Sequence, residues 1–270
     1  MSFLDEWKSG MIDSVIDTFQ TFDGYLNNSY SLLVTDVFSG QWADISNQIA
    51  AIVKPTAVVI AGICFMIEFL KITINTDILK LEYLIKVFAK LCIAKACIDV
   101  SDDLLKFVYV IVSGWITHVT DETISVGTTL ASSAQTTLES ANFGQVLAIY
   151  LSSMVFIVFL KIIGICINVM GYARSFELTC VNSVAPLPFA FLCIEENQGS
   201  RVFRNFAFVY IGICLRGLFM VISLSVFCTL AGNISFESWT KGLSDLLVLS
   251  LVLLMALMKS DQWAQRIFNG

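Results

Sequence analysis

Residues 146–230 decide the fold, and they read VLAIYLSSMVFIVFLKIIGICINVMGYARSFELTCVNSVAPLPFAFLCIEENQGSRVFRNFAFVYIGICLRGLFMVISLSVFCTL. Two long apolar segments, 146–170 and 203–230, flank a shorter segment that is interrupted by Pro186 and Pro188. Each long segment reaches the roughly 20 residues that a helix needs to cross a hydrocarbon core about 30 Å thick. This stretch therefore predicts membrane-spanning helices, with the lipid bilayer as their solvent.

The composition indicates the same class of protein. Hydrophobic residues make up 57% of the 270 residues and charged residues 14%, against about one half and one quarter in a soluble domain. The eight cysteines lie mostly in apolar runs without CxxC spacing, which favours buried thiols over disulfides or metal ligands. The sequence contains no P-loop, HExxH or GxSxG motif. We therefore expect no catalytic residue, no cofactor and no metal, and a protein that is not an enzyme.

The hydrophobic pattern predicts an all-α, polytopic transmembrane helix bundle with about five spans. An amphipathic helix is expected over 3–22, followed by a turn at Asp23–Gly24. The spans are expected at about 49–71, 98–119, 146–170, 203–230 and 243–258. The outer loop 120–145 is polar and is expected to hold one short helix.

Residues 80–119 leave two arrangements open. In the preferred one, a basic helix on the cytoplasmic side precedes a single span over 98–119. The i,i+4 pairs Lys95–Asp99 and Asp102–Lys106 would support helix through the polar junction. In the other, two spans are joined by an outer turn at 99–103.

The basic residues are segregated along the chain, and their positions predict the orientation. Basic residues are absent between Lys8 and Lys54, between Lys106 and Lys161, and between Arg216 and Lys241. Because basic loops stay on the cytoplasmic side, we expect the N-terminus outside and the C-terminus inside. Residues 1–48 then form an extracytoplasmic amphipathic N-terminal region, and residues 49–270 form a transmembrane helical domain.

Residues 176–193 are expected to form a re-entrant segment. Charged residues typical of the cytoplasmic side flank it at both ends, with Arg174 and Glu177 at its start. A true span would place one of these charged ends outside, so the segment should instead turn back at Pro186 and Pro188. Non-helical backbone at membrane depth must be shielded by protein or must face water. The turn should therefore lie inside the bundle or line a cavity.

Ionisable residues at membrane depth are the candidate functional residues. Arg216 lies about 20 Å into its span, where a charge costs at least about 2.5–3.5 kcal/mol. It is expected to line a polar path, to contact another subunit or to hydrogen-bond carbonyls at the Pro186–Pro188 break. Lys161 either joins that path or extends its amine to the inner membrane surface.

Two further groups complete the candidate residues. The path or contact residues also include Arg174, Glu177, Pro186 and Pro188. The basic residues Lys86, Lys90 and Lys95 form either a face that contacts lipid headgroups or a docking surface for an acidic cytoplasmic partner.

Residues 171–232 carry a recognisable pattern. An Arg-x-x-Glu at Arg174 and Glu177 is followed by the segment APLPFAF, the polar turn ENQGSR and an aromatic span with a polar residue in its middle. This pattern resembles TrbL-like polytopic membrane subunits of conjugative type IV secretion systems, particularly the compact forms of Gram-positive elements. The resemblance implies five spans, an outer N-terminus and a cytoplasmic C-terminus, as the charges predict independently.

The resemblance implies a function as well. It points to a multi-pass channel or scaffold subunit in the bacterial cytoplasmic membrane that forms a homo-oligomer. Its expected partners are secretion ATPases, bitopic membrane proteins and a translocated DNA–relaxase substrate. Two alternatives are a small-solute transporter, with the re-entrant turn as its binding site, and a structural membrane anchor of a multiprotein complex. Five spans without an internal repeat argue against the transporter.

Overall fold

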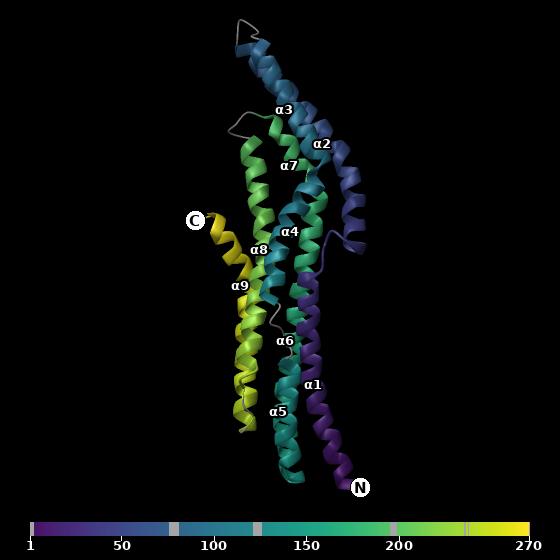
Figure 1. Ribbon diagram of the computed structural model, residues 1–270, viewed down its shortest axis with the longest axis vertical. Coiled ribbons are helices and arrows are strands. Elements are labelled where there is room, and N and C mark those ends of the chain that lie inside the picture. The colour runs from purple at the N-terminus through teal and green to yellow at the C-terminus, as the bar shows by residue number, and fades with distance from the viewer. Residues whose placement is uncertain are drawn as a thin grey trace. The chain divides into compact units, whose positions relative to one another are not determined.

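The computed structural model describes residues 3–75, 81–120, 126–194, 199–234, 236 and 238–269, and these contain helices and no strand (Figure 1). The helices in chain order are α1 (Phe3–Val34), α2 (Gly40–Asn75), α3 (Leu81–Asp99), α4 (Ser101–Thr120), α5 (Val126–Ser140), α6 (Phe143–Val184), α7 (Pro186–Ala190), the 3₁₀ helix η1 (Phe191–Cys193), α8 (Gly199–Ala231) and α9 (Trp239–Asn269). The all-α prediction is confirmed.

Within the described ranges, four helical stretches are long and apolar enough to cross a membrane. They are Gly40–Lys71, Phe143–Cys193, Arg201–Ala231 and Trp239–Ile267, and each contains one of the expected spans. The remaining expected span, 98–119, forms α4 but is not among the four; its first six residues include Asp102, Asp103 and Lys106. The chain is therefore a polytopic helical protein with four candidate spans where the sequence predicts about five.

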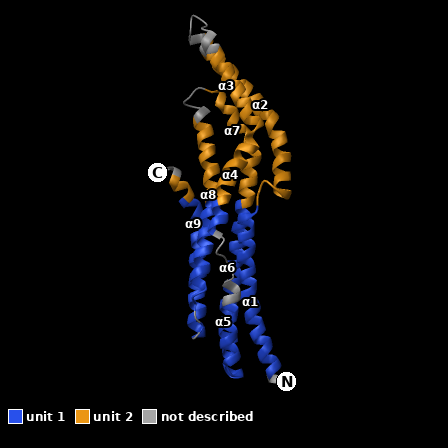
Figure 2. Ribbon diagram, in the orientation of Figure 1, with its two compact units in different colours: residues 1–35, 115–174, 216–263 blue, residues 36–114, 175–215, 264–270 orange. Residues whose placement is uncertain are grey.

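The chain divides into two compact units, each assembled from separate segments (Figure 2). Unit 1 contains residues 1–35, 115–174 and 216–263, and unit 2 contains residues 36–114, 175–215 and 264–270. The long helices α6 and α8 contribute residues to both units. The regions 1–48 and 49–270 that the sequence suggests stay a prediction.

In unit 1, α1 extends beyond the amphipathic helix that the sequence predicts. The expected turn at Asp23–Gly24 is wrong, because α1 continues to Val34. The buried side of α1 continues across this position at helical spacing, with Phe22 and Leu26 each 2% exposed. The ring of Phe22 packs against Phe227 of α8 at a centroid distance of 6.1 Å. Burial of this face outweighs the modest cost of one glycine within a helix.

The described part of residues 120–145 holds one short helix, as predicted. This helix, α5, packs on α1. The Lys8 ammonium donates to the carbonyls of Glu139 at 3.2 Å and Ala141 at 2.6 Å, at the end of α5. The last carbonyls of a helix lack intrahelical partners and carry partial negative charge. Lys8 therefore fastens the end of α5 to α1.

In unit 2, α7 and η1 pack against α2 and α3. Their common core consists of small and aromatic residues, namely Ala57, Ala61, Cys64, Ala94, Ile98, Phe189, Ala190 and Cys193. Small residues let helices approach closely where van der Waals packing is the main attraction, as it is in lipid. The ring of Phe189 also packs against that of Phe203 at 5.1 Å, so α8 joins the same core.

The chain changes from α3 to α4 at Val100. Helix-type hydrogen bonds persist across this residue, from Val100 N to the carbonyl of Ala96 and from Leu104 N to the carbonyl of Val100, both at 3.1 Å. The junction lies within the region where both sequence interpretations place a change. Whether residues 81–119 cross a membrane once or twice stays a prediction.

The proline-containing segment differs from its predicted form. The sequence suggests a span over 146–170 and a separate segment over 176–193, but α6 is continuous from Phe143 to Val184. Gly171 and Arg174, between the two, are buried helical residues. The break at Pro186 is confirmed: α6 ends at Val184 and the five-residue α7 begins at Pro186. Re-entry of residues 176–193 into the membrane stays a prediction.

Replacing Lys8 by Met should weaken the attachment of α5. The loss of a cation at the end of a helix costs about 0.3–1 kcal/mol, so the amides of α5 should exchange hydrogen with solvent severalfold faster. Hydrogen–deuterium exchange of the purified protein measures this, and Lys8→Arg should retain the slow exchange. Unchanged exchange in Lys8→Met would contradict the fastening role.

Candidate functional site

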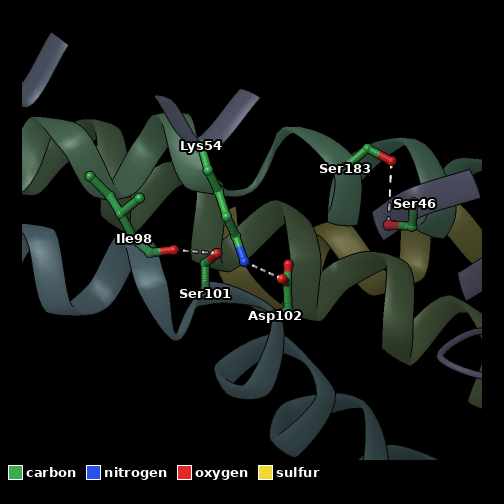
Figure 3. Close-up of polar contacts among 6 residues, drawn as sticks. All are labelled: Ser46, Lys54, Ile98, Ser101, Asp102 and Ser183. Atoms are coloured by element: carbon green, nitrogen blue, oxygen red, sulfur yellow. Dashed lines mark hydrogen bonds and ion pairs between the residues drawn. The ribbon is translucent and has the colours of Figure 1, made fainter. Parts of the chain in front are cut away.

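Two helices of unit 2 are joined by an ion pair. The Nζ atom of Lys54 in α2 lies 2.6 Å from a carboxylate oxygen of Asp102 in α4 (Figure 3). Both side chains are partly buried, with 30% and 34% of their surfaces exposed. Asp102 also lies in the first turn of α4, where the helix dipole favours a negative charge. A lysine inside a candidate span is thus matched by a carboxylate of the same unit.

The junction between α3 and α4 places Asp102 in the pair. Ser101 is completely buried, and its hydroxyl donates to the carbonyl of Ile98 at 2.9 Å (Figure 3). This bond saturates a carbonyl at the end of α3, where intrahelical donors run out. Because Asp102 directly follows Ser101, the local geometry of the junction orients the carboxylate toward Lys54.

A second polar contact in unit 2 joins α6 to α2. The hydroxyl oxygens of Ser183 and Ser46 lie 3.3 Å apart (Figure 3), and the Ser183 hydroxyl donates to the carbonyl of Thr179 at 2.7 Å. Further along unit 2, the Tyr210 hydroxyl of α8 donates to the carbonyl of Leu105 in α4 at 3.0 Å. In lipid the hydrophobic effect does not drive helices together, so polar contacts of this kind help to join helices at specific positions.

In unit 1, Arg174 joins α6 to the end of α1. Arg174 is 0% exposed, and its guanidinium Nη1 donates to the carbonyl of Leu33 at 3.0 Å. Leu33 lies in the last turn of α1, which carries no basic residue of its own. The final carbonyls of a helix need an external donor and favour a nearby cation. The guanidinium of Arg174 supplies both the hydrogen-bond donor and the positive charge.

Gly217 of α8 leaves the space that the Arg174 guanidinium occupies. A Cβ atom at position 217 would overlap the Cζ and Nε atoms of Arg174. The guanidinium is fully buried, so it has no room to move aside without giving up its contact with Leu33. Position 217 therefore requires glycine for the close approach of α6 and α8 within unit 1.

The other path candidates lie on α6, α7 and α8. Arg216 is half-buried on α8, beside Gly217, while Lys161 is exposed on α6. Glu177 is half-buried on α6, six residues before Ser183. Pro186 is buried at the start of α7, and Pro188 is half-buried. The sequence predicts a hydrogen bond from Arg216 to a carbonyl at a helix break. A bond of this kind, from an arginine to a carbonyl at a helix end, is made by Arg174.

The basic residues of α3 lie mainly on its surface. Lys86 and Lys95 are exposed and Lys90 is partly exposed. Lys95 pairs with Asp99 at 2.9 Å, as the i,i+4 spacing predicts. The corresponding pair predicted between Asp102 and Lys106 is wrong, because Asp102 bonds to Lys54 instead. The contacts of Lys86, Lys90 and Lys95 with lipid headgroups or with an acidic partner stay a prediction.

Sequence reasoning missed the partners of Lys54 and Arg174. Lys54 entered only as a marker of orientation, and Gly217 did not enter at all. One signal was present for Lys54, since a lone lysine in an apolar helix requires a counter-charge. Its partner lies 48 residues away, and nothing local in the sequence selects it. In the described parts of the chain, no group of three His, Cys, Asp or Glu side chains is arranged to hold a metal.

Replacing Gly217 by Ala should destabilise the protein. The added methyl group displaces the Arg174 guanidinium, and overpacking of this kind costs about 1–3 kcal/mol. Gly212 lies on the same helix and has no described atom within 4 Å of a Cβ placed there. Gly212→Ala should therefore be neutral or raise stability by about 0.5–1 kcal/mol through helix propensity.

Thermal unfolding of the two variants in detergent distinguishes these effects. The cost of Gly217→Ala should shrink when Arg174 is also replaced by Ala, since the two residues are in contact. Equal stabilities for Gly212→Ala and Gly217→Ala would show that the guanidinium does not occupy this space.

Comparison with known proteins identifies one family. The family model described as TrbL/VirB6 plasmid conjugal transfer like protein matches residues 35–186, which is more than half of the chain. The matched range contains Lys54, Asp102 and Arg174, and it ends at Pro186. Searches of the curated proteins and of the solved structures found no match.

Proposed function

The chain belongs to the TrbL/VirB6 plasmid conjugal transfer-like family, and we propose that it is a channel or scaffold subunit that helps a DNA–protein substrate cross the bacterial cytoplasmic membrane. Membership makes it a membrane subunit of a conjugal transfer system. It also places the chain among structural secretion subunits rather than in a known enzyme family. Four apolar helical stretches in the described chain indicate a multi-pass membrane protein.

The family match carries this proposal, and the polar contacts support it. A lone charge at the centre of a span costs at least about 2.5–3.5 kcal/mol. Lys54 and Asp102 offset this cost by pairing with each other, and Arg174 bonds to a carbonyl. Contacts of this kind join helices at specific positions, which suits a scaffold that keeps its geometry around a conduit.

The proposal includes partners outside the chain. We place the protein in a homo-oligomer, in contact with secretion ATPases and bitopic membrane subunits. The exposed Lys86 and Lys95 and the partly exposed Lys90 are the proposed contact for an acidic cytoplasmic partner. Arg216 and Lys161 are proposed to contact a neighbouring subunit or the conduit. Glu177 and the Pro186–Pro188 turn are proposed to support that region.

Exchanging the charges of the Lys54–Asp102 pair tests the scaffold role. Lys54→Asp alone and Asp102→Lys alone each place two like charges together, so each should reduce conjugal transfer at least tenfold. The double exchange restores an opposite pair and should recover a large part of the transfer. Mating assays measure the frequency, and immunoblots of membrane fractions measure the amount of inserted protein.

The control is the exposed pair Lys95–Asp99, which has the same chemistry on the surface of α3. Exposed pairs contribute little to stability, so single charge reversals there should leave the amount of protein in the membrane unchanged. Normal transfer by both Lys54→Asp and Asp102→Lys, at normal protein levels, would argue against the proposed role of the pair.

A further inference from the structure

The first helix runs beside α6 within unit 1 in a nearly constant register. Three hydrogen bonds join α1 to α6: Ser29 Oγ to the carbonyl of Ile167 at 3.2 Å, Asn28 Nδ2 to Asn168 Oδ1 at 2.8 Å, and Arg174 Nη1 to the carbonyl of Leu33 at 3.0 Å. The bonded residues are separated by 138, 140 and 141 positions in sequence. A constant separation means that the two helices run parallel.

The same register holds toward the other end of α1. A Cβ atom at Gly164 would meet the rings of Tyr25 and Phe22. Further along, residues 6–11 and residues 147–151 line one groove of about 590 Å³. Residues 7–33 of α1 therefore lie beside residues 147–174 of α6 (Figure 2).

The side of α6 that is not covered by protein has the character of a lipid-facing surface. The exposed apolar residues along this stretch include Leu151, Val155, Val158, Ile162, Ile165 and Val169, each 48–62% exposed. Lys161 is exposed beside them, and its long side chain can carry the amine toward the membrane surface. They lie within the apolar segment 146–170, which belongs to one of the four candidate spans. Through the shared register, the middle of α1 lies at the depth of this lipid-facing stretch.

The uncovered side of α1 has the opposite character. Its buried side is mainly apolar, with Val15, Phe19, Phe22 and Leu26 each 2% exposed, and it also contains Thr18 and Ser29. One stripe of its exposed side carries Asp13, Asp17, Gln20, Asn27 and Ser31 at helical spacing. We call these five residues the polar face of α1.

The helix α5, which packs on α1, also exposes polar side chains. On α5, the side chains of Ala134 and Leu138 are buried, whereas Ser132, Gln135 and Glu139 are exposed. Carboxylates and amides at the depth of the hydrocarbon core cannot face lipid; they face protein or a water-filled space. Two neighbouring helices with polar outer sides indicate a water-filled space.

We infer that α1 crosses the membrane beside α6 and that its polar face lines a water-filled conduit in the assembled complex. The inference deepens the proposed channel function and rests on it. For residues 7–33, it replaces the expected location outside the membrane. Because α1 and α6 run parallel, α1 then ends on the side of the membrane where α6 ends, and a crossing by the candidate span of α2 leads back to the opposite side. The inference and the cytoplasmic contact proposed for the lysines of α3 therefore exclude each other.

The polar face carries Asp13 and Asp17, and no Lys or Arg occurs between Lys8 and Lys54. Such a wall repels the phosphate backbone of a nucleic acid, so a passing strand would not adhere to it.

Cysteine accessibility tests the inference without any assay of DNA transfer. Gln20→Cys on the polar face and Ile162→Cys on the lipid-facing side lie at the same depth by the shared register, and both positions are exposed in the chain. Cells expressing each variant are treated with a membrane-impermeant, charged methanethiosulfonate, and the modified peptides are quantified by mass spectrometry. The native cysteines can remain, because each peptide is identified by its mass.

We expect Gln20→Cys to react at least tenfold faster than Ile162→Cys. Leu26→Cys, at a position 2% exposed on the buried side of α1, should be as slow as Ile162→Cys. A rate for Gln20→Cys no faster than that of Ile162→Cys would overturn the inference, since it would mean that lipid or another protein covers the polar face.

A second measurement shows whether α1 lies beside α6 when it reacts. The double variant Asn28→Cys with Asn168→Cys should form a disulfide on mild oxidation, because the native side chains are in hydrogen-bond contact. Asn27→Cys with Asn168→Cys is the control and should cross-link poorly. Absence of the first cross-link would overturn the inference even if Gln20→Cys reacts rapidly, because α1 would then lie outside the membrane.

These outcomes are distinct from failure of the proposed function. If the reactivity and the cross-link are as expected while charge-exchanged variants at Lys54 and Asp102 transfer DNA normally, the conduit wall stands and the role of that ion pair fails. If transfer depends on the pair but the polar face is unreactive, the reverse holds.

Discussion

Hydrocarbon does not solvate charges or open backbone groups, and this constraint governs the polar contacts that join helices within each unit. Lys54 and Asp102 lie 2.6 Å apart. The buried Arg174 reaches the carbonyl of Leu33 at the end of α1, and the hydroxyls of Ser46 and Ser183 meet between α2 and α6. Each contact satisfies a group that lipid would leave unsatisfied. Together they determine which helices pair within each unit, where apolar packing alone would discriminate poorly.

The Arg174 contact shows how several elements depend on one polar group. It closes the end of α1, holds that end against α6, and requires glycine at position 217 of α8. The ion pair has a similar position in unit 2, where the α3–α4 junction at Val100 and Ser101 directs Asp102 toward α2. Removing one partner from such a contact leaves a charge unsatisfied, so its effect should extend beyond the residue that is changed.

The sequence was sufficient for features that depend on local composition. Apolar length predicted the spans, the i,i+4 spacing predicted Lys95–Asp99, and Pro186 predicted the end of α6. Features that depend on distant partners were not predictable. The Asp23–Gly24 turn was expected because its residues favour turns, but burial of α1 against α6 and α8 extends the helix. Lys54 and Asp102 are separated by 48 residues, and no alternation or motif connects them.

The central claim is that the charge of Lys54, inside a candidate span, is paired with Asp102 of the same unit, and this contact can be measured directly. Solid-state NMR of the protein in lipid bilayers, with ¹⁵N in the lysine amine and ¹³C in the aspartate carboxylate, measures the dipolar coupling between these two atoms. The account predicts a strong coupling that corresponds to the 2.6 Å nitrogen–oxygen contact and that is lost in Asp102→Asn. A folded protein in bilayers that shows no coupling between Lys54 and Asp102 would contradict it.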